Sequence, residues 1–111
     1  MAPLKFYTNS FDHGDADSLF GTWSFVHFGS GVLAGAVAAF YIKHSTASIG
    51  TLSTIWLLAV MLWEVFEQIG YNGNATGWAF TYEHPVNKLT DIAVGLIAFA
   101  LLLFVAKVDV A

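Results

Sequence analysis

Three long apolar segments alternate with short polar connections along the chain. The apolar segments cover about residues 19–43, 46–70 and 86–107, and each holds few titratable side chains. At 1.5 Å per residue, an α-helix of this length spans the ~30 Å hydrocarbon core of a bilayer. Backbone groups in that core must form their hydrogen bonds internally, and the alternating pattern of barrel strands is absent here. The pattern therefore predicts an all-α fold, a three-helix transmembrane bundle.

Residues that start or end helices stand at the boundaries of these segments. Residues 15–18 and 45–48 supply N-cap candidates before the first two helices. Gly70, with Asn72 and Gly73 beyond it, suits a helix end and turn, and Pro85 suits the first turn of the third helix. Because the first connection is very short, we expect the first two helices to be antiparallel neighbours.

The same pattern predicts the domain organisation. Residues 1–17 form an acidic polar arm, and residues 18–111 form a single three-helix transmembrane domain. The longer second connection, 71–84, contains alternating aromatic residues that favour a loop in the headgroup interface. The tryptophans are interpreted as interfacial anchors.

Composition supports a membrane protein and excludes several other classes. Hydrophobic residues make up 57% of the 111 residues and charged residues 11%, against about 25% charged in an average soluble domain. Four Lys+Arg against eight Asp+Glu exclude the basic surface that nucleic-acid binding requires. The absence of cysteine excludes disulfides and thiolate metal sites. The lipid bilayer is the expected partner.

The distribution of charge bears on orientation. Lys5 and Lys88 fall on one side of the predicted membrane and Lys43 and Lys107 on the other, so the positive-inside rule gives no majority. Acidic residues gather on the side of the N-terminus and the long loop. This asymmetry favours a non-cytoplasmic N-terminus in a multi-pass integral membrane protein.

Ionisable residues of all three segments are expected at a similar depth in one leaflet. His27 lies ~12 Å from the start of the first helix, and Glu64 lies ~9 Å from the end of the second. Glu67 is about one turn nearer the surface, and Asp91 lies ~9 Å into the third helix. Three spans place these helix ends on the same side of the bilayer. We therefore predict a buried polar cluster.

The helical phase of these residues also favours an inward position. Glu64 and Glu67 share a helix face, with Gln68 beside them. His27 and Asp91 each share a face with small residues, which allow close helix packing. The glycines on these faces are Gly31, Gly35 and Gly95.

Several chemistries would account for such a cluster. Crowded carboxyl groups can share a proton, or a divalent metal such as Zn, Fe or Mn can bind to His27, Glu64, Glu67 and Asp91. A structural network of hydrogen bonds between the helices is a third interpretation. An axial bond from His27 to haem or chlorophyll is a further alternative. The supporting polar residues are Gln68, Asn87, Lys88 and His84.

Part of this pattern resembles a known family. His27-Phe28, then the run from Glu64 to Gln68, then Asn87, Asp91 and Gly95 resemble the VanZ-like group of small polytopic membrane proteins. The similarity covers about residues 23–98. It implies a role near the cell envelope or lipid headgroups, with the polar cluster as the site. The arginine usual in that family is missing here, because the chain contains no arginine.

The leading functional hypothesis is a small membrane protein that self-associates or joins other membrane subunits. Its buried cluster would bind a cation, a proton or a lipid headgroup. One alternative is a metal-dependent membrane hydrolase acting on a lipid-linked substrate, which would use a metal-bound water. Another is a structural membrane protein of a virion or of a photosynthetic or respiratory complex. The sequence assigns no catalytic residue.

Overall fold

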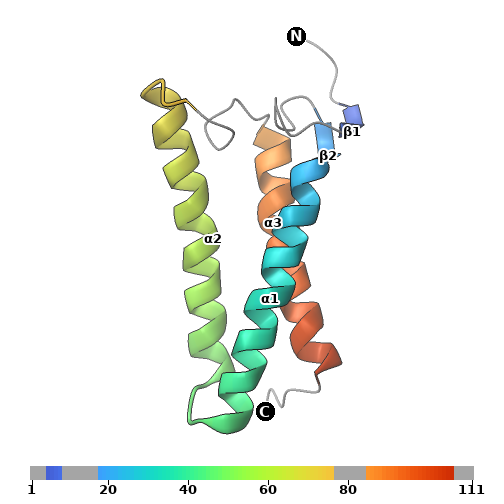
Figure 1. Ribbon diagram of the computed structural model, residues 1–111, viewed down its shortest axis with the longest axis vertical. Helices are drawn as coiled ribbons and strands as arrows, with labels where there is room; N and C mark the ends of the chain where they lie inside the picture. The colour runs from blue at the N-terminus through green and yellow to red at the C-terminus, as the bar shows by residue number, and fades with distance from the viewer. Residues whose placement is uncertain (1–4, 9–17, 77–84, 107–111) are drawn as a thin grey trace.

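The computed structural model describes residues 5–8, 18–76 and 85–106 and contains three long helices (Figure 1). These are α1 (Thr22–His44), α2 (Ile49–Asn72) and α3 (Pro85–Val105). Two short strands, β1 (Lys5–Thr8) and β2 (Ser18–Gly21), precede α1. Each helix is long and apolar enough to cross a membrane. The predicted fold of three transmembrane helices is confirmed, and it indicates a multi-pass integral membrane protein.

Most helix boundaries follow the predicted capping signals. α2 begins after Ser48, whose hydroxyl oxygen accepts a hydrogen bond from the backbone N–H of Thr51. Its end is closed by Gly73, whose N–H donates to the carbonyl oxygen of Ile69 at 3.0 Å. α3 begins at Pro85, as expected for a residue without an N–H.

The predicted start of the first helix is wrong by a few residues. Residues 18–21 form β2 instead of helix, and α1 begins at Thr22 with Gly21 as its N-cap. β2 pairs in parallel with β1, with Tyr7 opposite Phe20. The strands belong to segments that are distant in the sequence, so the local pattern did not predict them. The acidic residues at 12, 15 and 17, and the aromatic part of the predicted loop 71–84, lie outside the described residues.

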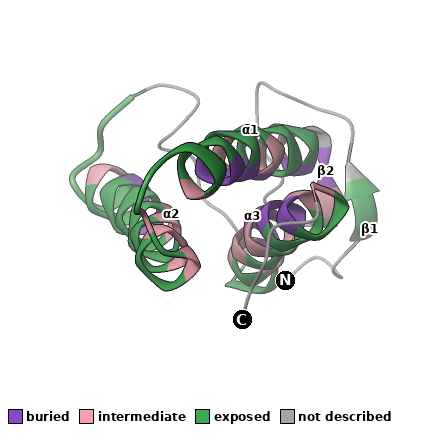
Figure 2. Cartoon of the chain, turned by 90° about the horizontal axis from the view of Figure 1, so that it is seen from below, coloured by how far each residue is buried: buried purple, intermediate pink, exposed green. Residues whose placement is uncertain are grey.

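α1 packs mainly against α3. These two helices run in the same direction and lie side by side, whereas α2 stands apart from both over much of its length (Figures 1 and 2). Ala38 and Ala39 of α1 form an apolar core with Phe99 and Leu103 of α3. The short connection does make α1 and α2 antiparallel, as expected. However, the principal neighbour of α1 is α3. A short loop determines the relative direction of the two helices that it joins but not which helix each of them packs against.

Glycines allow the close approach of α1 and α3. A Cβ atom at Gly31 would lie 2.8 Å from the Cβ of Ala98 and would also collide with the carbonyl oxygen of Gly95. At Gly35 it would lie 2.8 Å from the Cβ of Leu102. Distances below 3.0 Å cannot be accommodated without movement of the neighbour. The glycines of α1 therefore allow the close helix packing that small residues typically provide in membranes.

Candidate metal centre

Three ionisable side chains from three helices lie together near the end of the bundle where α1 begins. His27 comes from α1, Glu64 from α2 and Asp91 from α3, and one ligand atom of each lies within 4.8 Å of the other two. Asp91 is 1% exposed and Glu64 6%. The predicted convergence is found for these three residues, because the fixed helical rise brings them to the same depth.

Asp91 is held by the first two turns of α1. The Nε2 atom of His27 lies 3.4 Å from Oδ2 of Asp91. The hydroxyl of Ser24 donates to Oδ1 at 3.5 Å, the outer limit of a hydrogen bond. Ser24 in turn accepts a hydrogen bond of 3.0 Å from the N–H of Gly21. Ser24 thus connects Gly21, the N-cap of α1, to the buried carboxylate of α3.

Glu64 has a different environment. Neither of its carboxylate oxygens accepts a hydrogen bond from a described donor. Its neighbours include the carboxyl group of Glu67, one turn further along α2, and the ammonium group of Lys88 on α3. A buried acceptor without a donor costs about 1–3 kcal/mol, and more when it is charged. Glu64 is therefore the member of the group that a bound cation would stabilise most.

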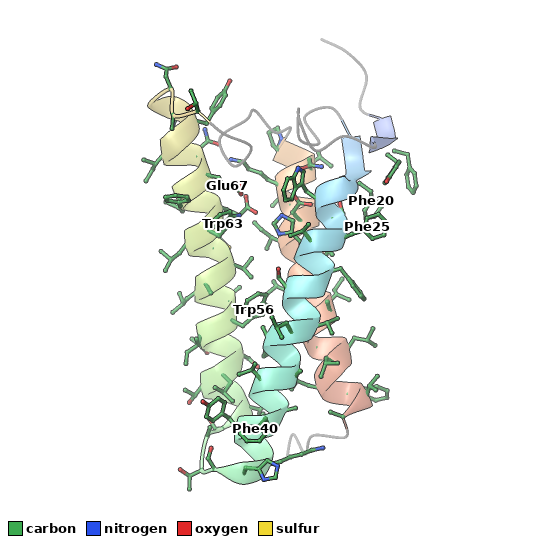
Figure 3. The ribbon with its side chains drawn as sticks, in the orientation of Figure 1. Phe20, Phe25, Phe40, Trp56, Trp63 and Glu67 are labelled. Carbon is green, nitrogen blue, oxygen red and sulfur yellow. The ribbon has the colours of Figure 1, made fainter. Side chains whose placement is uncertain are left out.

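The other predicted polar site residues that the structure describes lie on α2 and α3, within about a turn of Glu64 or Asp91. Glu67 is buried on the side of α2 that faces the other two helices (Figure 3), but it is not one of the three residues whose ligand atoms meet. Asn87 is fully buried one turn before Asp91. Lys88 donates a hydrogen bond to Oε1 of Gln68 and so links α3 to α2. His84 lies outside the described residues.

No protein-family model, curated protein or solved structure matches this chain. The resemblance to VanZ-like proteins gains no support from these comparisons.

Sequence reasoning missed the contribution of Trp56. Its indole N–H donates to the carbonyl oxygen of Gly95 at 3.1 Å, and its ring stacks on Phe99 with centroids 6.0 Å apart. The assignment of this tryptophan to the interface is wrong, because it lies between the helices (Figure 3). Its position ~11 Å beyond the start of α2 was a usable signal, since an interfacial anchor belongs near a helix end.

The three ligand atoms form a mixed nitrogen and oxygen donor set. One imidazole and two carboxylates suit divalent first-row metals such as zinc, manganese and iron. In a tetrahedral site with metal–ligand distances of about 2.1 Å, neighbouring ligand atoms lie ~3.4 Å apart. The separation of 3.4 Å between His27 and Asp91 already has this value.

Proposed function

We propose that this chain is an integral membrane protein that binds a divalent transition-metal ion within one leaflet, with His27, Glu64 and Asp91 as ligands. The observation that carries the proposal is the meeting of their ligand atoms, one from each helix, within 4.8 Å of one another. A single ion at this position would contact all three helices.

The charge balance supports a cation over a purely structural network. Such a network would need donors for both oxygens of Glu64, and among the described residues neither oxygen has one within hydrogen-bond geometry, although Glu67 and Lys88 lie nearby. A divalent cation would satisfy these oxygens and offset the charge of Asp91 as well. A proton shared between Glu64 and Glu67 would relieve only part of the cost of burying the Glu64 carboxylate. One proton bridges a single pair of oxygens, one from each carboxyl group.

The geometry also predicts what binding changes. His27 and Asp91 already have the spacing of two metal ligands, since α1 and α3 are closely packed. Glu64 belongs to the helix with the fewest contacts. Metal binding should therefore draw α2 toward the other two helices and stabilise the bundle, because a ligand bound by the folded state alone raises its stability.

Metal content of the purified protein tests the proposal. The protein in mild detergent should bind one zinc or manganese ion per chain after chelator treatment and reloading, as measured by elemental analysis. Glu64→Gln should weaken metal affinity by about a hundredfold or more, because even the loss of outer-shell partners costs about 10–100-fold.

Two matched controls separate a ligand from a neighbour. Glu67→Gln makes the same change one helical turn away and should retain most of the metal. His44→Ala should bind metal as the unchanged protein does, whereas His27→Ala should not. Absence of bound metal after reloading, or equal affinity in Glu64→Gln, would contradict the proposal. Native mass of the same samples tests the expected self-association.

A further inference from the structure

A lysine lies among the carboxylates of the proposed metal site. Lys88 comes one helical turn before Asp91 on α3, a spacing that places the two Cβ atoms about 5–6 Å apart. Its ammonium group donates a hydrogen bond to Oε1 of Gln68 on α2. Gln68 directly follows Glu67 and lies one turn from Glu64, which has this ammonium group among its neighbours. Lys88 therefore stands close to all three buried carboxylates.

The charge of this lysine is held in place by two helices. Its backbone belongs to α3, whereas its ammonium group is bound to Gln68 on α2. A lysine near the end of a membrane helix commonly extends its ammonium group into water. Lys88 instead reaches across to the neighbouring helix, and its side chain is half-buried. A fixed positive charge therefore accompanies the site.

The charges around the site match those of a divalent ion. The charged side chains of the described helices, residues 22–76 and 85–106, are those of Lys43, Glu64, Glu67, Lys88 and Asp91. Lys43 lies at the other end of α1, so the site holds three carboxylates and one ammonium group. His27 would bind a metal as neutral imidazole. Two negative charges then remain, and an ion of charge two balances them.

This balance matters because the site lies within a membrane. Excess charge in the hydrocarbon region is costly, and charges there are screened less than in water. A trivalent ion would leave one positive charge at the site, close to the ammonium group of Lys88. Without that ammonium group, the three carboxylates would match a trivalent ion instead.

We infer that Lys88 selects the charge of the bound ion, favouring a divalent over a trivalent cation. The inference rests on the proposed metal site and adds a residue that acts on the ion through its charge without being a ligand. Lys88 offsets one of the three carboxylates, so that the ligands and their surroundings require two positive charges. The hydrogen bond to Gln68 keeps this offset next to the ion.

Competition between manganese(II) and terbium(III) tests this role. Isothermal titration calorimetry of the chelator-treated protein in neutral detergent gives the affinity for each ion. Lys88→Met should raise the ratio of terbium affinity to manganese affinity at least about tenfold and should not weaken manganese binding. This is the effect of one additional charge on an ion up to about 10 Å away, at an effective dielectric constant of about 20. Lys88→Gln, a polar neutral variant, should give the same change.

Two further lysine variants serve as controls. Lys88→Arg retains the charge and should keep the ratio of the unchanged protein. Lys43→Met removes the same charge at the other end of α1 and should also leave the ratio unchanged. An unchanged ratio in Lys88→Met and Lys88→Gln would overturn the inference. Equal loss of both ions would also overturn it, because Lys88 would then only hold α3 to α2.

The failure of this inference can be distinguished from failure of the metal site. If the unchanged protein binds manganese and Glu64→Gln loses it, while removal of the Lys88 charge leaves the ratio as it was, only the role of Lys88 is wrong. If the unchanged protein binds neither ion, the metal site is wrong and the inference about Lys88 falls with it.

Discussion

The α1–α3 pair and α2 differ in what holds them, although all three helices are long and apolar enough to cross a membrane. α1 and α3 meet through their backbones at Gly31 and Gly35. In the membrane-spanning part of α2 only 6% of residues are buried, against 22% in α1 and 28% in α3. α2 contacts α3 partly through hydrogen bonds. The indole N–H of Trp56 donates to the carbonyl oxygen of Gly95, and the ammonium group of Lys88 donates to Gln68.

This difference shows that apolarity makes a membrane helix but does not choose its neighbour. In a bilayer, apolar surfaces gain little by leaving lipid for protein, so close packing of small residues and hydrogen bonds between helices decide association. α1 and α3 associate through close packing of small residues, whereas α2 depends on hydrogen bonds. The proposed metal site, with two of its ligands on the closely packed pair and one on α2, is thus partly formed without a cation.

The largest effect is expected from breaking the α1–α3 pair. Gly31→Ala should lower the free energy of unfolding by about 3 kcal/mol, because its Cβ meets the backbone of Gly95, which cannot rotate away. Thermal unfolding in detergent, followed by circular dichroism, measures the loss.

Gly29 provides a matched control two residues away. A Cβ at Gly29 would meet no atom of another helix within 4 Å, so Gly29→Ala should leave stability unchanged or raise it by up to about 1 kcal/mol through helix propensity. If both variants lose stability equally, the glycines matter for the helix itself and the close approach of α1 and α3 is not the cause.

The fold was predictable where it depends on local pattern. Span lengths and the caps at Ser48, Gly73 and Pro85 follow from neighbouring residues alone. The spacing of Gly31 and Gly35 indicated a packing face but not which helix fills it. The short connection suggested α2, and the structure places α3 there. The pairing of β1 with β2 depends on contacts between distant segments and gave no local signal.

The site was predictable in depth but not in detail. A fixed helical rise places His27, Glu64 and Asp91 at one level, whatever the packing. Which of two acidic residues on α2 reaches the others depends on the rotation of that helix, so Glu64 and Glu67 were equivalent in the sequence. The contact of Ser24 with Asp91 likewise depends on how α1 rotates against α3.

Two leucine substitutions compare the carboxylates of the two regions in metal-free protein. Glu64→Leu should raise the free energy of unfolding by about 2 kcal/mol, because it removes a buried acceptor without a described donor. Asp91→Leu should lower it by about 2 kcal/mol, because Ser24 and His27 lose their partner. Thermal unfolding after chelator treatment gives both values.

Added zinc distinguishes these changes from general effects on folding. At a hundredfold excess over its dissociation constant, zinc should stabilise the unchanged protein by about 2.7 kcal/mol and should not stabilise Glu64→Leu. A loss of stability in metal-free Glu64→Leu would mean that its carboxylate is already satisfied within the protein, against the contrast drawn between α2 and the α1–α3 pair.

The smallest effect is expected where α2 meets α3 at mid-membrane. Trp56→Phe keeps an aromatic ring against Phe99 but removes the N–H that donates to Gly95. It should cost about 0.6 kcal/mol, the average for hydrogen bonds between membrane helices. Trp56→Leu also removes the ring contact and should cost more. Unfolding of both variants in detergent separates the two contributions. If the phenylalanine variant is as stable as the unchanged protein, ring packing rather than the hydrogen bond attaches α2 here, and α2 would resemble the α1–α3 pair more closely than its exposed surface indicates.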